Sequence, residues 1–510
     1  MARKRQKTHS VLRLPLFLLI GGVASFAMWI PAIHALILDD HPTSQSFFYS
    51  GILGLMLVIL IGLSMGNKVP QYGMPGQLLS LLATFVVLPL FLAVPVSDAL
   101  GNTRFLNAYF DMVSSITTTG AAIFGDGDRL PSSIHLWRGL VAWLGGFLML
   151  LAASAVLAPL SLGGFEVTAR GEPGGVVAAP HMEKSEARQQ LVIVFRALAP
   201  IYVGLTLALW LLLLSTGGSF TPALIHAMSV MSTSGISGVG GVENATSGLG
   251  GEMIMFLFMF FSLSRLTFSS DTLGSESRRL DRDPEFRLGL LLAISVPLML
   301  FIRHWFAALE ISAGDGFWLA LSALWGAMFT VMSFLSTTGF ESAQWQSAQA
   351  WSGLETPGMI LMGMAMIGGG VATTAGGVKL LRVYALYLNG LGEMERLVHP
   401  SSVSGGGKMT KRLQRNGAYV AWVFFMLFAL SLAVISTMLS AVGASFEDAL
   451  ILSVAMLSTT GPLTEIAGSG PIALEFLSSP AKLILCVAMV LGRLETLAFI
   501  ALLSPNLWRS

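Results

Sequence analysis

The chain has 510 residues, of which 54% are hydrophobic and only 11% are charged. Soluble domains carry about 25% charged residues, so this composition excludes a soluble protein of ordinary surface and indicates many membrane spans. A formal net charge of +1 leaves no basic face, which excludes nucleic acid as a partner.

Apolar runs in chain order predict ten membrane spans, an even number that places both termini on the same side. The first run follows a basic segment at residues 1–7 and extends from 14 to 38. It is longer than the apolar core of a signal peptide, so we expect a retained first helix. The single cysteine, Cys486, falls in the last run and is expected to pack in the core. The predicted spans are 14–36, 51–65, 78–96, 136–160, 191–214, 253–263, 288–306, 359–387, 419–442 and 483–503.

The charges between the spans favour one orientation. Basic residues gather in the amino terminus and in three polar linkers on the same face, which the positive-inside rule makes cytoplasmic. The opposite loops are mostly acidic. The basic linker residues are Arg170, Lys184, Arg188, Arg278, Arg279, Arg282, Arg287, Lys408, Lys411, Arg412 and Arg415, and the acidic loop residues are Asp39, Asp40, Asp126, Asp128, Glu243, Glu341 and Glu465.

An internal repeat is the most informative signal in the sequence. Four stretches, 105–120, 220–235, 324–339 and 446–461, align without gaps on a final glycine. Each has alanine twelve residues before that glycine and three consecutive hydroxyl residues directly before it. Hydroxyl residues and glycine are also common where membrane helices touch, but that interpretation does not explain four copies in one register.

Each copy lies between two predicted spans and has about ten largely apolar residues before the hydroxyl run, too few to cross a bilayer. We therefore expect a re-entrant half-helix and a short loop, and irregular backbone survives at membrane depth only inside protein or beside a water-filled cavity. Four such loops around one axis would line a pore in which backbone carbonyls and hydroxyls replace the water shell of a monovalent cation. Glycine lets a carbonyl turn inward, and the negative end of each half-helix points at the cation. The predicted filter residues are Thr118, Thr119, Gly120, Thr233, Ser234, Gly235, Thr337, Thr338, Gly339, Thr459, Thr460 and Gly461.

Short motifs in the first and last units resemble those of a known family. They are Thr-Thr-Thr-Gly-Ala at 117–121, Trp-Arg at 137–138, Trp-Leu-Gly-Gly at 143–146 and Gly-Arg-Leu-Glu at 492–495. Together with the repeats, they make the chain similar to the Trk/Ktr/HKT superfamily of potassium and sodium transporters, closest to the bacterial TrkH type. The resemblance covers nearly the whole chain. It implies an all-α membrane protein of about ten transmembrane helices with four re-entrant pore loops in a pseudo-fourfold arrangement.

The resemblance also implies a division of the chain and a set of partners. Residues 1–72 would form an N-terminal two-helix extension, followed by pore units at 73–170, 171–280, 281–400 and 401–510. The implied protein takes up potassium across the bacterial inner membrane, is surrounded by membrane lipid, and forms a homodimer with one pore in each protomer. A cytosolic nucleotide-binding ring of TrkA type would regulate it. Glycine at all four filter positions favours potassium, because serine at the first often accompanies sodium in this superfamily.

The third inner helix contains a glycine-rich run, 368–379. Glycine costs about 1 kcal/mol in a helix interior, so this run should break the span, although small residues can also serve close helix packing. The resemblance places an intramembrane gating loop here, beneath the filter, with Ala375 where the family more usually has glycine. It also implies that Arg493, deep in the last apolar run, projects into the pore, a buried structural bridge being the alternative. The expected gate residues are Gly368, Gly369, Gly370, Thr373, Thr374, Gly376, Gly377, Lys379 and Arg493.

Three other functions are alternatives to this hypothesis. A sodium-conducting protein, or a potassium symporter coupled to Na⁺ or H⁺, belongs to the same superfamily, and residue 120 is the discriminating position. An intramembrane enzyme would need clustered charges in its spans, and the candidates in this sequence are expected to be isolated. An alternating-access carrier would have inverted repeats, whereas the four copies here run in one direction. The sequence has no nucleotide-binding motif and no metal-like histidine cluster, so we expect no cofactor and no enzymatic activity.

Overall fold

The computed structural model describes residues 15–65, 74–124, 129–157, 184–264, 280, 283–307, 317–354, 357–399, 417–468 and 470–495. Within these ranges the regular elements are helices, and no strand occurs. The predicted all-α class is confirmed. Several sequence predictions concern residues outside these ranges, namely the basic amino terminus, the ends of the spans predicted at 136–160 and 483–503, and Asp126, Asp128, Arg170, Arg278, Arg279, Arg282, Lys408, Lys411, Arg412 and Arg415.

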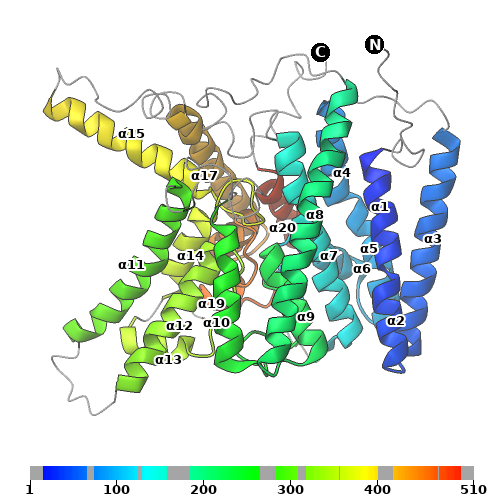
Figure 1. Ribbon diagram of the computed structural model, residues 1–510, viewed down its shortest axis with the longest axis horizontal. Helices are drawn as coiled ribbons and strands as arrows, with labels where there is room; N and C mark the ends of the chain where they lie inside the picture. The colour runs from blue at the N-terminus through cyan, green and yellow to red at the C-terminus, as the bar shows by residue number, and fades with distance from the viewer. Residues whose placement is uncertain are drawn as a thin grey trace.

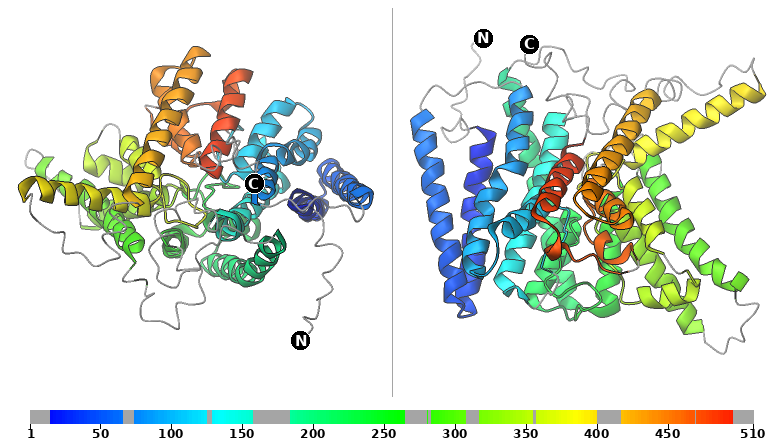
Figure 2. Two further views of the ribbon diagram at one scale, coloured as in Figure 1. Left: turned by 90° about the horizontal axis from the view of Figure 1, so that it is seen from above. Right: turned by 180° about the vertical axis from the view of Figure 1, so that it is seen from behind.

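The first three helices form a hairpin at one edge of the molecule (Figures 1 and 2). Helices α1 (Leu16–Ala27) and α2 (Trp29–Ile37) make one apolar span, and α3 (His41–Met65) runs back beside them. The start of α3 lies ten residues before the predicted start of this span. Its polar first turns are stabilised by two acidic side chains: Asp40 accepts a hydrogen bond from the N–H of Thr43 (3.3 Å), and Ser46 donates to Asp98 of a later helix (2.5 Å).

The rest of the chain forms four successive units, each of which contains one of the four repeated segments. The first contains α4 (Met74–Val86), α5 (Leu88–Leu100), α6 (Phe105–Ile116) and α7 (Ser132–Ala152). The second contains α8 (Lys184–Ser215), α9 (Phe220–Ser232) and α10 (Gly248–Met259). The third contains α11 (Pro284–Ala307), α12 (Phe317–Leu335), α13 (Trp345–Ser352), α14 (Gly358–Ile367) and α15 (Leu380–Val398). The fourth contains α17 (Ala418–Ala441), α18 (Phe446–Leu457), α19 (Leu463–Ile466) and α20 (Ser479–Leu494).

The four units close into a ring in chain order. Helix α7 packs on α9, α10 on α12, α14 on α18, and α20 of the last unit on α6 of the first. Seen from above, these helices surround a central region of loops, and α15 extends outward from the bundle (Figure 2). The ring therefore brings the four repeated segments toward one centre although the chain between them is long.

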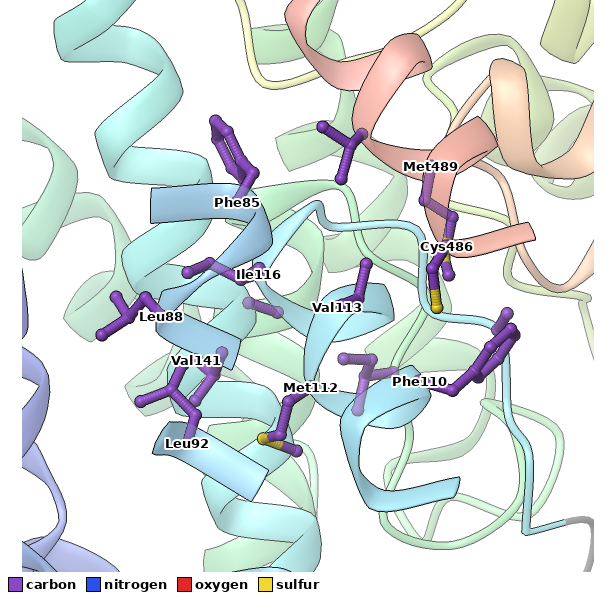
Figure 3. Packing of buried hydrophobic residues seen from close by; sticks show 14 of the residues in the cluster. Phe85, Leu88, Leu92, Phe110, Met112, Val113, Ile116, Val141, Cys486 and Met489 are labelled. Carbon is purple, nitrogen blue, oxygen red and sulfur yellow. The ribbon is translucent and has the colours of Figure 1, made fainter. Parts of the chain in front are cut away.

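The junction between the last and first units is a tightly packed apolar core (Figure 3). Helix α6 lies in it between α5, α7 and α20. The single cysteine, Cys486, is buried here beside Met489, as predicted. Van der Waals contact among such side chains stabilises this packing, because lipid tails are as apolar as the side chains themselves. The labelled side chains of the core are Phe85, Leu88, Leu92, Phe110, Met112, Val113, Ile116, Val141, Cys486 and Met489.

Eight helical spans of the described chain are long and apolar enough to cross a membrane. Helices α10, α14 and α20 are shorter than that, and the span predicted at 359–387 is divided between α14 and α15. The expectation of about ten residues before each hydroxyl run holds approximately for α6, α9 and α18, in each of which 12 residues precede the run. It is wrong for α12, which has 19, because the apolar residues from Phe317 onward continue the helix. Ten crossings stay a prediction.

Candidate functional site

The four repeated segments end in turns that share one backbone hydrogen bond and one left-handed residue. In each, the N–H of the residue before the final glycine donates to the carbonyl of the residue six before that glycine, at 2.8–3.0 Å. The threonine two before the glycine has a left-handed conformation in all four, with φ of 53–58°. A β-branched residue at positive φ is a strained outlier, and such strain persists only where the surrounding structure imposes it. These threonines are Thr118, Thr233, Thr337 and Thr459.

The final glycines stand where neighbouring loops meet. A Cβ atom at Gly120 would overlap the backbone carbonyl of Ser234 in the second loop, and one at Gly235 would overlap that of Thr338 in the third. A Cβ at Gly339 would lie 2.8 Å from the ring of Pro462. One at Gly461 would overlap the backbone of Ala121 in the first loop, which completes the circle. The predicted filter residues are thus brought together, and no side chain fits at the four glycine positions.

The hydroxyls of the loops fall into two groups. The two hydroxyl residues on either side of the strained threonine form a hydrogen bond with each other in the first and third loops. Thr117 bonds to Thr119 and Ser336 bonds to Thr338, both at 2.8 Å. Two of the four strained threonines differ from these residues. Among the described residues, the Oγ1 atoms of Thr118 and Thr459 are buried and have no hydrogen-bond partner. Buried hydroxyls are normally paired, so these two are exceptions among the hydroxyls of the four turns.

The glycine-rich run at 368–379 folds into an irregular loop that leaves and rejoins the helix axis at nearly the same point. The N–H groups of Val378 and Lys379 both donate to α14 carbonyls at 2.9 Å, and that of Leu380 donates to Gly369 at 2.9 Å. Gly368 and Gly377, at φ of 72° and 76°, make the reversals. We refer to residues 368–379 as the intramembrane loop.

The intramembrane loop lies directly against three of the four turns. The N–H of Gly376 donates to Thr337 Oγ1 of the third turn at 2.8 Å. The hydroxyl of Thr374 donates to the carbonyl of Met231, just before the second turn, at 3.2 Å. A Cβ at Gly376 would overlap the carbonyl of Ser458 and the hydroxyl of Thr459 in the fourth turn. The predicted gate residues and the predicted filter residues are therefore in contact.

Both predicted cationic gate residues hold carbonyls of the intramembrane loop. Arg493 in α20 is 4% exposed, and its guanidinium donates to the carbonyl of Thr374 at 2.7 Å. The ammonium of Lys379 donates to the carbonyl of Ala375. The remaining nitrogens of Arg493, Nε and Nη2, are buried without a hydrogen-bond partner in the described chain. Arg493 is thus a link from α20 to the intramembrane loop.

The expectation that buried charges are isolated is wrong. Arg382 and Glu495 form a buried ion pair at 2.6 Å, with the guanidinium 3.6 Å from the ring centroid of Phe424. Asp111 in α6 and Arg138 in α7 form another at 2.9 Å. The partners in the first pair are 113 residues apart, so no local sequence pattern could have found it. These pairs join helices rather than cluster around a reaction centre.

Three acidic side chains predicted to lie in separate loops act on one another. Glu341 follows the third turn and is half-buried. Burial, reinforced by the charges of Glu243 and Glu465, raises the pKa of Glu341 to about 7. These two partners follow the second and fourth turns. The three carboxyls therefore share one negative potential close to the turns that they follow.

Comparison with known proteins agrees with this architecture. Residues 250–510 match the family described as TrkH, cation transport protein. The chain is 30% identical to the Trk system potassium uptake protein TrkH of Salmonella typhimurium, over 80% of each chain. It is 29% identical to the protein of the same name from Escherichia coli K12, over 95% of this chain and 96% of that one.

Two further comparisons extend the likeness. A third protein of that name, from Halomonas elongata, is 31% identical over 84% of each chain. The crystal structure of the potassium transporter TrkH from Vibrio parahaemolyticus matches with a TM-score of 0.78, covering 99% of this chain and all of that one at 24% sequence identity. At that identity the structural match shows a shared fold.

Proposed function

The chain belongs to the TrkH family of cation transport proteins, and we propose that it takes up potassium across a bacterial inner membrane through a passage lined by the four turns. The relatives named as potassium uptake proteins favour this ion. The four re-entrant half-helices would be α6, α9, α18 and the end of α12. The proposed filter is formed by the hydroxyl-glycine residues of the four turns, and potassium is its substrate.

The observation that carries the proposal is the convergence of four similar turns around four glycines. Each turn ends a helix whose negative dipole end faces the centre, which favours a cation there. The unpaired hydroxyls of Thr118 and Thr459 add oxygen ligands, as a cation that leaves its water shell requires. Flux would follow the membrane potential, which supplies about 2.3 kcal/mol per charge per 100 mV, without nucleotide hydrolysis by this chain.

The intramembrane loop is the proposed gate. It lies against three turns, and Arg493 holds its Thr374 carbonyl. A cation that passes the turns would meet this loop and a positive charge in a low-dielectric wall, where repulsion is strong. Movement of the loop away from the turns would remove both obstacles. The proposed homodimer and the TrkA-type regulatory ring would act on this movement from outside the described chain.

Flux of potassium or rubidium into liposomes that contain only this protein tests the proposal. We expect uptake that follows an imposed negative-inside potential and that sodium competes with weakly. Protein without uptake of any monovalent cation, in a preparation shown to be folded, would contradict the proposal. Coupling of purified transport to ATP hydrolysis would contradict it as well.

The alternative within the same family is a sodium conductor or a potassium symporter driven by Na⁺ or H⁺. The glycine at position 120 favours potassium, because a serine there would add a competing hydroxyl to the filter. Reversal potentials under bi-ionic potassium and sodium conditions distinguish the first possibility. Potassium uptake that requires a sodium or proton gradient at zero membrane potential would identify the second.

A further inference from the structure

The third turn has an anchor that the proposed mechanism does not use. Glu252 lies in α10 of the second unit and is 1% exposed, although α10 is otherwise largely apolar. A carboxylate buried this deeply is costly unless donors satisfy it. Its two oxygens accept three hydrogen bonds, and all three donors belong to the third unit.

The three donors come from both sides of the third turn. Before the turn, the indole N–H of Trp325 in α12 donates to Glu252 Oε2 at 2.8 Å. After it, the hydroxyl of Ser342 donates to the same oxygen at 2.7 Å, and the N–H of Ala343 donates to Oε1 at 2.7 Å. Hydrogen bonds to a carboxylate are shorter and stronger than neutral ones. One side chain therefore ties the incoming helix and the outgoing segment of this turn to a neighbouring unit.

The segment that Glu252 holds begins at the proposed filter glycine. From Gly339 the chain reaches Ser342 in three residues, and the N–H of Ser342 donates to Thr330 of α12 at 3.2 Å. The N–H of Phe340 donates to Ser333 at 2.6 Å. The polypeptide on either side of Gly339 therefore cannot spread or shift without breaking these bonds or those to Glu252.

We propose that Glu252 is a positioning residue for cation selectivity, whose carboxylate fixes the place of the third turn in the filter. The inference rests on the proposed potassium function and deepens it. Discrimination between potassium and sodium depends on how the carbonyl oxygens are held around the ion. Loss of the anchor leaves the turn free to adapt to the smaller ion, so selectivity falls before conduction does.

Three substitutions test this role at the two ends of the anchor. Glu252→Gln replaces a carboxylate that accepts from three donors with an amide that has one acceptor oxygen and a donor group of its own. Trp325→Phe and Ser342→Ala each remove a single donor. Trp351→Phe is the matched control, because it removes an indole N–H of the same unit that donates to Phe301 and not to Glu252.

The measurement is the potassium-to-sodium permeability ratio in liposomes, together with total flux and the Tm in detergent. We expect Glu252→Gln to lower the ratio about threefold to tenfold and the single-donor variants to lower it less. Combining Glu252→Gln with Ser342→Ala should lower it no further than Glu252→Gln alone, because both act on one interaction. Trp351→Phe should keep the ratio of the unmodified protein.

The outcomes separate this inference from the function on which it rests. If the unmodified protein carries neither ion, the proposed function fails and the inference falls with it. If the unmodified protein selects potassium and the folded variants keep the same ratio, the role of Glu252 alone is refuted. A lower Tm and flux with an unchanged ratio in Trp325→Phe and Ser342→Ala would likewise mark Glu252 as a structural anchor without influence on selectivity. If Glu252→Gln does not fold, the permeability ratios of Trp325→Phe and Ser342→Ala decide whether Glu252 influences selectivity.

Discussion

The first three turns and the fourth share one sequence signature but differ in how they are held. The serine six residues before the glycine uses its hydroxyl in the first three turns: Ser114 donates to the Ala121 carbonyl, Ser229 bonds to Ser234, and Ser333 accepts from Phe340. The fourth turn has Ala455 at that position. Nine residues before the glycine, Asp111, His226 and Thr330 each contact a polar partner, and the fourth turn has Leu452.

The backbone of the fourth turn differs as well. Gly120, Gly235 and Gly339 have φ of 66–84°, whereas Gly461 is outside the left-handed region. The N–H of Gly461 donates to the carbonyl of Thr119 in the first turn at 2.6 Å, and the next residue, Pro462, packs against the second and third glycines. The fourth turn thus closes the ring through its neighbours, while the others are braced by their own side chains. A carbonyl has two lone pairs, so Thr119 can keep this bond and still face a cation.

The largest effect should come from the backbone of the first three turns. Gly120→Ser should reduce the preference for potassium over sodium by more than about tenfold, because its φ of 71° disfavours a side chain and a Cβ would overlap the Ser234 carbonyl. Bi-ionic reversal potentials measure it. Gly443→Ser is a control, since Gly443 also has positive φ but nothing lies within 4 Å of its added Cβ. An unchanged ratio in folded Gly120→Ser would refute the filter assignment.

The polar side chains nine residues before the glycine should contribute unequally to the free energy of unfolding. Asp111→Ala leaves Arg138 buried without its ion partner, and such losses cost about 3–5 kcal/mol. His226→Ala removes a hydrogen bond to Ser237 at 2.9 Å and packing against Phe340, so we expect a smaller loss of about 1–3 kcal/mol. Thermal unfolding in detergent compares them. The double variant Asp111→Ala/Arg138→Ala should be less destabilised than the sum of the singles, and strict additivity would mean that the pair does not act as a unit.

The four turns could be predicted from the sequence because the residues that form each turn are consecutive. Three hydroxyl residues before a glycine, repeated four times with the same spacing, can be recognised without knowing which distant residues are in contact. The same reasoning missed Glu252 and the Arg382–Glu495 pair, because their partners lie 73 to 113 residues away and only the ring of units brings them close. It also placed the start of α3 too late, since polar residues in its first turns are stabilised by Asp40 and Asp98 rather than by apolar packing.

The intramembrane loop offers a test of a different kind, because it directly contacts the second, third and fourth turns. Arg493→Ala should raise basal flux severalfold and leave the permeability ratio nearly unchanged, since it frees the Thr374 carbonyl and removes a positive charge without touching the glycines. Deletion of residues 369–376 should act in the same direction. Arg493→Lys keeps the positive charge, so its basal flux should lie between that of the unmodified protein and that of Arg493→Ala. Folded variants that conduct no better than the unmodified protein would show that the loop serves packing and not gating.

The smallest effect concerns the acidic side chains beyond the second, third and fourth turns. Burial raises the pKa of Glu341 to about 7, so this carboxyl loses its proton near neutral pH. The folded protein holds that proton more strongly than the unfolded chain, whose carboxyl has a pKa of 4.5, so the contribution of Glu341 to stability falls as pH rises between these values. The negative charge that the carboxyl gains as pH rises through 7 attracts cations toward the turns.

Potassium flux should therefore rise about twofold as the pH on that side increases through 7, because a potential of this size changes the local cation concentration only modestly. Glu341→Gln should remove most of the rise while leaving flux at low pH as it was, since the protonated acid and the amide are both neutral. Glu447→Gln, an exposed acid at the start of α18, is the matched control and should keep the pH dependence. High salt should weaken the effect by screening, whereas a pH profile identical in Glu341→Gln and unmodified protein would assign the titration to another group.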